Sequence, residues 1–183
     1  PGNFTKIQDA VNEACSGDTI YVYDDSAPYF EHVVVNKSIT LIGEDKNSTE
    51  INGSFLDSMV DTISVVHDDV VIRGFSITHN QGYYYQAAVK ITGNYTILSH
   101  CIIKRNEWIG IYVVDASFCR IEDCELYQNL VAIHLVGSRE NVLQNCVCHD
   151  NADGITLFSK SHDNQLIDCI CSENYFDNML IQQ

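Results

Sequence analysis

Short runs of apolar, polar and apolar residues recur along this 183-residue chain at a nearly constant interval. Each run alternates as a β-strand does and is too short for a helix. One series reads Ile63-Ser-Val, Val89-Lys-Ile, Ile111-Tyr-Val, Ile133-His-Leu, Ile155-Thr-Leu and Met179-Leu-Ile. A second series reads Val70-Val-Ile, Thr96-Ile-Leu, Cys119-Arg-Ile, Asn141-Val-Leu and Asn164-Gln-Leu. A third run precedes each of the asparagines described next, so the pattern predicts three short strands per repeat.

An asparagine stands at the same place in five successive repeats. The segments read FSITHN, CIIKRN, CELYQN, CVCHDN and CICSEN, and their asparagines lie 26, 23, 22 and 23 residues apart: Asn80, Asn106, Asn129, Asn151 and Asn174. Self-similarity with a period of about 20 to 50 residues is typical of a solenoid. Three short strands per turn, coiled and stacked, predict an all-β fold: a parallel β-helix with about 22–23 residues per coil.

The N-terminal residues follow a helical pattern instead. Thr5-Lys-Ile-Gln8 has the form of a capping box, and apolar residues follow at helical spacing up to Gly17. We expect a short amphipathic helix over residues 5–15 that covers the open N-terminal end of the stack. The coils then occupy residues 19–183, and a chain of this length forms one domain, 1–183.

Three further strands are expected in the first coils, over Thr19–Tyr23, His32–Val35 and Ile39–Ile42. The run that starts at Ile39 aligns with the run that starts at Val70, but at an offset of 31 residues. Because this offset exceeds one period, we expect an inserted surface loop near Lys46–Met59.

The two ends of the chain differ. The chain begins with Pro1 and shows no signal peptide, which indicates a mature or excised piece. No helix or polar repeat follows Met179–Gln183, so we expect an exposed coil edge with Met179 and Ile181 as apolar contact residues. Such an edge recruits another chain by strand addition, and contacts between unlike ends build rings or open filaments.

The two most regular columns are interpreted as structural. An inward asparagine at a repeated turn bonds its own coil and the next through its amide, and so satisfies buried turn groups. The cysteines form one column at Cys101, Cys124, Cys146 and Cys169 and another at Cys148 and Cys171, where other coils hold inward hydrophobes. In-register neighbours point their Cβ atoms the same way, so we favour free thiols over intrachain disulfides. Cys15 and Cys119 lie outside the columns and are candidates for bonds between chains.

Charge and composition narrow the range of partners. A net charge of −15 repels phosphate backbones and anionic lipids, which argues against nucleic acid. No run of about 18 apolar residues exists, so no transmembrane segment is expected. No C-x2-C pair occurs and the histidines are scattered, so neither a metal site nor another cofactor is predicted. One polar column leaves a cation site open as an alternative to plain solvent exposure: His100, Asp123, Asn145 and Asp168.

The opening residues, PGNFTKIQDAVNEACSGDTIYVYDDSAPYFEHVVVNKSITLIGED, resemble the start of right-handed parallel β-helix proteins of the pectate-lyase-like superfamily. The repeats Asn106 to Ile111 and Asn151-Ala-Asp-Gly-Ile155 are similar to those of repeat-rich surface proteins of methanogenic archaea. The resemblance covers the whole chain and implies a right-handed coil. The superfamily includes lyases, hydrolases, epimerases, adhesins and wall or sheath components, so the fold alone does not decide the activity.

In the polysaccharide-cleaving relatives, the substrate groove runs along the outer face of one sheet. Here the two outward columns of the first series are Ser64, Lys90, Tyr112, His134 and Thr156, and Val66, Thr92, Val114, Val136 and Phe158. Neither column supplies the paired carboxylates of glycoside hydrolysis or an acidic calcium cluster beside an arginine base. No catalytic residue is therefore predicted.

Apolar side chains are predicted on the surface instead. The loops after the asparagines carry aromatic residues, and one outward strand column is largely apolar. Stacked in phase, they would form a stripe that packs against another subunit or binds sugars by stacking. The candidate contact residues are Tyr83, Tyr84, Tyr85, Trp108, Tyr175, Phe176, Val114, Val136, Phe158, Met179 and Ile181.

Five glycosylation sequons, none of them at a ladder position, indicate a secretory route: Asn3, Asn36, Asn47, Asn52 and Asn94. The leading hypothesis is a non-catalytic, extracellular or surface-displayed structural β-solenoid of the cell envelope, such as a sheath, surface-layer or adhesin module. It would associate with copies of itself or with other envelope proteins. A glycan-binding domain is the alternative, and a polysaccharide lyase or hydrolase is the third hypothesis.

Overall fold

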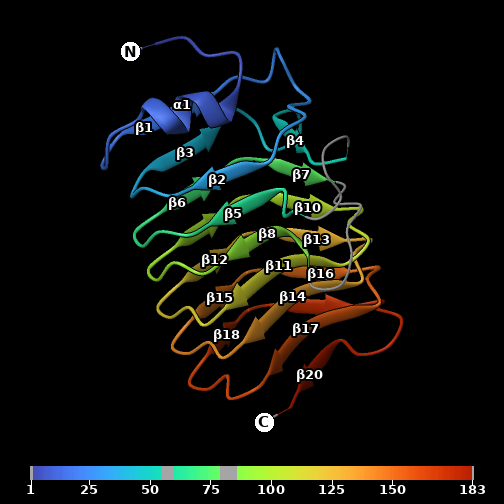
Figure 1. Ribbon diagram of the computed structural model, residues 1–183. Coiled ribbons are helices and arrows are strands. Elements are labelled where there is room, and N and C mark those ends of the chain that lie inside the picture. The colour runs from blue at the N-terminus through green and yellow to red at the C-terminus, as the bar shows by residue number, and fades with distance from the viewer. Residues whose placement is uncertain (1, 55–59, 79–85, 183) are drawn as a thin grey trace.

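The protein folds into a parallel β-helix in which the chain winds through three parallel sheets (Figure 1). The computed structural model describes residues 2–54, 60–78 and 86–182. Sheet A contains β1 (Thr19–Val22), β3 (Thr40–Gly43), β6 (Val71–Arg73), β9 (Ile97–Ser99), β12 (Arg120–Glu122), β15 (Val142–Gln144) and β18 (Gln165–Ile167). Sheet B contains β4 (Glu50–Asn52), β7 (Ser76–Thr78), β10 (Ile102–Lys104), β13 (Glu125–Tyr127), β16 (Val147–His149) and β19 (Ile170–Ser172). Sheet C contains β2 (Val33–Val35), β5 (Ile63–Val65), β8 (Ala87–Ile91), β11 (Ile109–Val114), β14 (Val131–Val136), β17 (Asp153–Phe158) and β20 (Met179–Ile181). The predicted fold, with three strands per coil, is confirmed.

The interior of the coil is filled by apolar columns, one side chain per coil. In sheet A, the parallel register places Leu98 beside Ile121 and Ile121 beside Leu143, and all three are fully buried. Buried columns from the three sheets join into one hydrophobic core that runs from Ile7 of the N-terminal helix to Leu157. Because each column is closely packed, truncating one of these leucines to alanine would cost about 2–5 kcal/mol.

The corners between the sheets are made by residues in the left-handed conformation. Five of them follow the sheet A strands: Gly74, His100, Asp123, Asn145 and Asp168. Among the described residues, four follow sheet B (Arg105, Gln128, Asp150 and Glu173), and nine follow sheet C (Asp69, Tyr95, Asp115, Phe118, Gly137, Glu140, Ser159, Lys160 and Asp163). Asn, Asp and His tolerate a positive φ better than most residues. This requirement explains the polar column that contains His100 and Asp123, which the sequence left open as a cation site.

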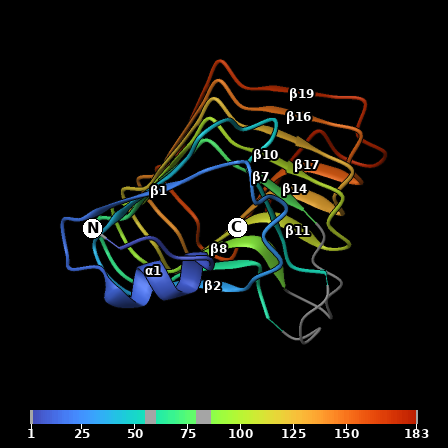
Figure 2. The same ribbon diagram turned by 90° about the horizontal axis from the view of Figure 1, so that it is seen from above.

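Helix α1 (Ile7–Glu13) lies across the N-terminal end of the stack, against β1 and β2 (Figure 2). It is shorter than the predicted span of 5–15, and the predicted capping box at Thr5 is wrong, because the N-cap residue is Lys6 and its side chain makes no capping bond. The buried Glu31 carboxylate takes over this role: it accepts hydrogen bonds from the amides of Ile7 and Gln8, both at 2.9 Å. A negative charge at a helix N-terminus is also favoured by the helix dipole.

Two more side chains fasten this helix to the first coil. The Lys37 ammonium donates to the carbonyls of Val11, Asn12 and Ala14 at the helix C-terminus, at 3.1, 2.6 and 2.7 Å. The Gln8 side chain accepts from the Val34 amide at 2.7 Å and so occupies the edge of β2. Helix α1 is therefore pinned at both ends and along one strand edge, which is how natural sheets avoid exposed edges.

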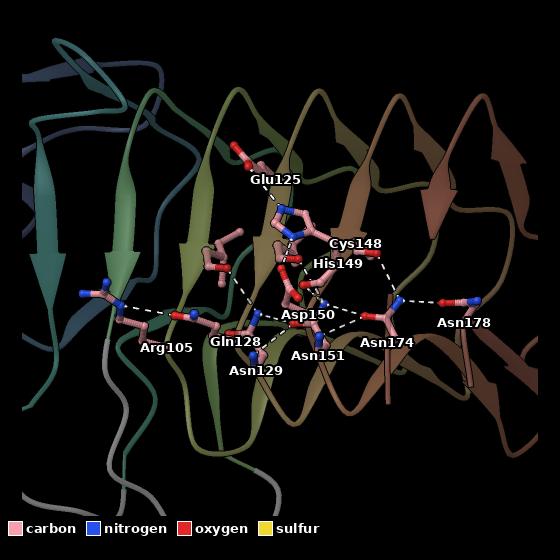
Figure 3. A network of polar contacts seen from close by, with 12 residues as sticks. Arg105, Glu125, Gln128, Asn129, Cys148, His149, Asp150, Asn151, Asn174 and Asn178 are labelled. Carbon is pink, nitrogen blue, oxygen red and sulfur yellow. Dashed lines mark hydrogen bonds and ion pairs between the residues drawn. The ribbon is translucent and has the colours of Figure 1, made fainter. Parts of the chain in front are cut away.

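The B–C corners hold the asparagine ladder, and Figure 3 shows its part from Asn129 to Asn178. Each side-chain amide donates to the side-chain oxygen of the next asparagine, at 2.7 Å from Asn106 to Asn129, 2.9 Å from Asn129 to Asn151 and 3.0 Å from Asn151 to Asn174. Asn178, which the sequence analysis did not single out, continues the row at 2.9 Å. The first three are buried, while Asn80 lies outside the described residues. The ladder supplies partners for buried turn groups, as such groups require.

A second ladder, which the sequence analysis missed, lies at the C–A corners. The Asn141 amide donates to Asn164 at 3.0 Å, and the Asn141 oxygen accepts from the Cys119 main chain at 2.8 Å. Beside it, the Ser138 hydroxyl accepts from the Ala116 main chain at 3.3 Å, and Ser161 does the same for Ser138 at 3.2 Å. These side chains link successive coils by hydrogen bonds, as the first ladder does. Side chains therefore connect the coils at two of the three corners of the solenoid.

The cysteines of both columns are free thiols: the column of Cys101, Cys124, Cys146 and Cys169 lines the corner between sheets A and B, while Cys148 and Cys171 pair within sheet B. The Cys146 thiol donates to Gln144 O in its own coil and to Ile121 O in the preceding coil, at 3.5 and 3.4 Å. Cys169 repeats this pattern with Ile167 O and Leu143 O, at 3.6 and 3.4 Å. Hydrogen bonds with the Cys101 and Cys146 thiols, together with burial, raise the pKa of Cys124, so the Cys124 thiol is uncharged. The thiols therefore act as weak hydrogen-bonding links between coils.

The segment expected to be a surface loop, Lys46–Met59, contains a strand instead. Strand β4 pairs with β7 and forms the edge of sheet B, while residues 55–59 lie outside the described residues. The prediction failed because Glu50-Ile-Asn52 carries a single apolar residue.

Gly43 and Gly74 end the two aligned runs that start at Ile39 and Val70. Their backbones lie in close contact: a Cβ on Gly43 would lie 2.2 Å from the Gly74 carbonyl oxygen, and Gly74 itself has a φ of +81°. Both positions therefore exclude larger residues.

Candidate functional site

One outward column of sheet B has a polar side chain in each of its six strands. The parallel register aligns six residues in a row along the axis of the solenoid: Asn52, Thr78, Lys104, Tyr127, His149 and Ser172. Neighbouring strands are about 4.8 Å apart, so the row offers a hydrogen-bonding group at that interval. We call it the polar row.

A hollow of about 250 Å³ opens on this face at the upper end of the polar row, lined by Glu50, Asn52, Thr78, Lys104 and Arg105. One oxygen of the Glu50 carboxylate accepts from the Thr78 hydroxyl at 2.8 Å and from the Asn52 amide at 3.1 Å. Arg105 stands at the B–C corner, where its Nε donates to the Gln128 side chain at 3.4 Å (Figure 3). The hollow thus joins two cations to one fixed carboxylate.

Further along the row, His149 lies between two carboxylates. Its Nδ1 is 2.7 Å from Asp150 Oδ2 and its Nε2 is 3.3 Å from Glu125 Oε1, as Figure 3 shows. The hydrogen bond to Asp150 raises the pKa of His149 above its ordinary value. The Tyr127 ring stacks on the imidazole, with centroids 5.2 Å apart and planes 14° apart. The two half-buried rings therefore hold each other in place.

Two carboxylates of this face, Glu50 and Glu125, are too far apart to act as a pair in glycoside hydrolysis. Glu50 of β4 and Glu125 of β13 occupy the same outward column, with β7 and β10 between them. Three strand intervals separate them by about 14 Å, which exceeds the roughly 6.5–9.5 Å of inverting enzymes and the shorter distance of retaining ones. Glu50 and Glu125 therefore do not form such a catalytic pair.

The outward column predicted on the first series is aligned on sheet C. Lys90 lies 5.8 Å from the centre of the Tyr112 ring, and Tyr112 stacks on His134 with centroids 5.3 Å apart. His134 Nδ1 contacts the Thr156 hydroxyl, and burial lowers the pKa of His134. Ser64 is aligned with Lys90 in the neighbouring coil and bonds Asp61 at 3.3 Å. The column is a packed stack with a neutral histidine, and it holds no carboxylate.

The predicted apolar contact residues fall into separate groups. Val114, Val136 and Phe158 are aligned and half-buried on the outer face of sheet C, where Val114, Val136 and Trp108 pack against an outer cluster of Ala87, Ile109 and Tyr112. Tyr175 and Phe176 are 81% and 68% exposed and form an edge-to-face pair with centroids 4.7 Å apart. Met179 and Ile181 occupy core-type positions beside Ile155 and Leu157 and are exposed. Tyr83, Tyr84 and Tyr85 lie outside the described residues.

One aromatic pair was not foreseen. Tyr95 and Phe118 stack in parallel at the C–A corner, with centroids 5.1 Å and planes 7° apart, and they are 51% and 39% exposed. Both have a positive φ, of 56° and 61°, where the adjacent coils hold Asp69 and Glu140. The signal in the sequence was their spacing of one coil, 23 residues, outside the three strand series. We call Tyr95, Phe118, Val114, Val136 and Phe158 the apolar strip.

The remaining candidates are placed as follows. Of the sequon asparagines, Asn3, Asn36 and Asn47 are exposed, whereas Asn52 and Asn94 are half-buried and bond Glu50 and Asp68 through their amides. Cys15 is exposed, but Cys119 is buried, so Cys119 is not available for a bond between chains. Across the described residues, no group of three or more metal-ligating side chains converges on one point. None of the described helices has the length and apolar character to cross a membrane.

A larger hollow of about 1040 Å³ lies at the N-terminal end, between residues 2–6, helix α1 and the edge of sheet A. Its aromatic lining comes from Phe4, Tyr21, Tyr23 and Tyr29. The Tyr29 hydroxyl is occupied by the Tyr23 carbonyl at 2.7 Å, and Tyr21 packs edge-on against Tyr23. Because the Tyr29 hydroxyl is already bonded, this hollow is a less specific candidate.

Comparison with known proteins supports the fold. ORF18 of Geobacillus virus E2 aligns with 89% of this chain at 16% identity and a TM-score of 0.69, and the chain spans 38% of that viral protein. The pectin methylesterase from Aspergillus niger aligns with 97% of this chain, and with 86% of its own, at 14% identity and a TM-score of 0.54. The carrot pectin methylesterase aligns with 98% of this chain, and with 85% of its own, at 12% identity and a TM-score of 0.48.

At these identities the likeness extends to the fold alone, and nothing in it supports the narrower resemblance to archaeal surface proteins. No curated protein matches the sequence. Residues 39–181, most of the chain, match the family described as the right handed beta helix region. The chain therefore belongs to the right-handed β-helix family.

Proposed function

We propose that this protein is a rigid structural module of the cell envelope that associates with copies of itself through the apolar strip. The observation that carries the proposal is the exposed Tyr95–Phe118 pair. A left-handed conformation costs a residue other than glycine about 1 kcal/mol or more, and Asn or Asp reduces that cost. Here two aromatic residues occupy such positions and remain partly exposed, so neither the turn nor the core accounts for them.

The column on sheet C extends the same argument. An outward column on a solvent-facing sheet is ordinarily polar, yet Val114, Val136 and Phe158 follow one another in register. These three side chains are half-buried, and contiguous apolar side chains that remain partly exposed commonly mark an interaction site. Because the strip repeats once per coil, a second copy related by a two-fold axis presents the same spacing, and the strip is complementary to itself.

The net negative charge of the protein determines how this contact depends on salt concentration. Each copy carries a net charge of −15, so two copies repel at low ionic strength. The screening length falls from about 30 Å at 0.01 M to about 8 Å at 0.15 M. Self-association should therefore strengthen as salt is added, which is the opposite of a contact held by ion pairs.

An extracellular location is part of the proposal. Three of the five sequon asparagines are exposed, which supports passage through a secretory route. Free thiols are unusual in oxidising compartments, but five of the eight here are buried in the coil, among them Cys101, Cys124 and Cys146. Burial protects these thiols from oxidants, so free cysteines are compatible with that location.

Sedimentation velocity tests the proposal. The protein should be monomeric in 0.01 M salt and should form dimers or larger species in 0.5 M salt. Val136→Asn on the strip should reduce association in high salt at least about tenfold, by the loss of a buried apolar contact of about 1.5–3 kcal/mol. Val147→Asn is the matched control, because Val147 is also half-buried and outward but lies on sheet B. A monomer in both salts, or equal loss with both variants, would contradict the proposal.

A further inference from the structure

We propose that the hollow on the outer face of sheet B binds a monoanionic polyol, that is, a sugar unit that carries one carboxylate or one sulfate ester. This site goes beyond the proposed self-association, since the hollow and the apolar strip lie on different sheets. The argument rests on three features of the hollow: unpaired positive charge, a fixed carboxylate and a small volume.

The positive charge comes from Lys104 and Arg105, which are adjacent in a chain with 10 basic residues against 25 acidic ones. Within the described part of the chain, neither forms an ion pair. The only hydrogen bond of the Arg105 side chain there is from Nε to Gln128, so its terminal nitrogens have no acceptor among the described residues. Arginine and lysine together provide a planar fork and a mobile point charge for an oxyanion.

The carboxylate of Glu50 lowers the net charge of the hollow and so limits the charge of the ligand that fits it. Its Oε1 is held by Thr78 and Asn52, and the Asn52 side-chain oxygen is in turn held by the Ser54 amide at 3.0 Å. Such a supported group needs little ordering when a ligand binds. Two cations and one carboxylate leave a single positive charge, which a monoanion neutralises and a dianion such as a phosphate ester exceeds. No side chain among the described residues donates to the other oxygen of Glu50, which can therefore accept a hydrogen bond from a ligand hydroxyl, so the proposed ligand is also a polyol.

The volume and position set the size of the ligand. About 250 Å³ is less than the roughly 300–1,000 Å³ of sites for drug-sized molecules, and it suits one sugar unit. The hollow opens onto the polar row, where Tyr127 and His149 continue at the strand interval. A bound sugar could therefore be one unit of a longer glycan that lies along the row.

Isothermal titration with small probes tests the chemistry. Glucuronate and glucose 6-sulfate separate the carboxylate from the sulfate, glucose lacks the anion, and acetate and inorganic sulfate lack the polyol. At least one acidic sugar should bind about tenfold or more tightly than glucose, acetate and inorganic sulfate, because hydrogen bonds to charged groups are the strong ones. No measurable binding of either acidic sugar, or equal binding of glucose, would overturn the proposal.

The variants copy residues that neighbouring coils hold at the same places. Lys104→Thr copies Thr78, and Arg105→Gln copies Gln128, which has the same left-handed conformation, so both should fold. Each should weaken binding of the acidic sugar about tenfold or more. Arg73→Gln on sheet A removes the same charge and should change nothing. Glu50→Gln should let glucose 6-phosphate bind as tightly as the monoanion does to the wild type. Unchanged affinity in both Lys104→Thr and Arg105→Gln, with normal melting temperatures, would contradict the assignment.

Discussion

Asn129 is bonded to Asn151 of the next coil through both its main chain and its side chain. The Asn129 amide and the Asn129 side-chain nitrogen both donate to Asn151 Oδ1, at 3.0 and 2.9 Å. The same side-chain nitrogen also donates to the Ile103 carbonyl of the preceding coil, at 3.2 Å. One buried amide therefore ties three coils together, and the coil spacing at this corner is fixed by side chains as well as by sheet pairing.

Replacement of Asn129 by alanine should lower the free energy of unfolding by about 1–3 kcal/mol, because buried donors lose their acceptor. The donors are the main-chain and side-chain nitrogens of Asn106, which bond Asn129 Oδ1 at 3.3 and 2.7 Å. Thermal unfolding followed by circular dichroism measures the change. Gln128→Ala, next to it but exposed, is the control and should have a small effect. Equal effects in the two variants would mean that the ladder is not a source of stability.

The N-terminal helix should depend on Glu31. Glu31→Ala removes the acceptor of two helix amides and should destabilise α1 by about 0.5–2 kcal/mol, as loss of an N-cap does. Hydrogen exchange should speed up at Ile7 and Gln8 and leave the central coils unchanged. Glu13→Ala, on the exposed face of the same helix, should leave exchange as it is. Protection that survives Glu31→Ala would show that α1 is held by packing alone.

Two histidines should act on stability in opposite pH ranges. Burial lowers the pKa of His134 below 6.5, so the unfolded chain takes up protons first and His134 reduces stability as the pH falls below about 6.5. The bond to Asp150 raises the pKa of His149, so its contribution is complete below about 6.5 and is lost as the pH rises through the folded-state pKa. Urea unfolding from pH 5 to 8 should therefore show a shallower acid slope in His134→Gln and a shallower alkaline slope in His149→Gln. If neither variant changes the slope of stability against pH, neither histidine contributes to the pH dependence of stability.

The thiols should react in three classes. Cys15 is exposed, Cys169 and Cys171 are half-buried, and the other five are buried. Reactivity requires an accessible thiolate, and burial raises the pKa of Cys119. A thiol reagent should therefore label Cys15 first and the five buried cysteines only on unfolding, which mass spectrometry of the peptides resolves. Early labelling of Cys124 or Cys146 would contradict the packed column.

Repetition determined what could be predicted from the sequence. The columns at Asn129 and Cys124 recur in register over several coils, so their periodicity alone located the strands and the corners. The second ladder was missed because Asn141 and Asn164 begin runs that read as strands, and only two coils carry it. Strand β4 was missed because its one apolar residue, Ile51, has no alternating partner. No pattern in the sequence indicates that Tyr95 would be left-handed, since that depends on where the corner falls.

The Tyr95–Phe118 pair gives the most direct test of the account. Tyr95→Asn/Phe118→Asn places a residue suited to the left-handed conformation at both corners. If the pair serves association, the monomer in low salt should melt at the same temperature or higher, while sedimentation in high salt should show at least about a tenfold loss of association. The contrary result is a lower melting temperature with association unchanged, which would make the pair a structural part of the coil and leave the proposed interface without its main support.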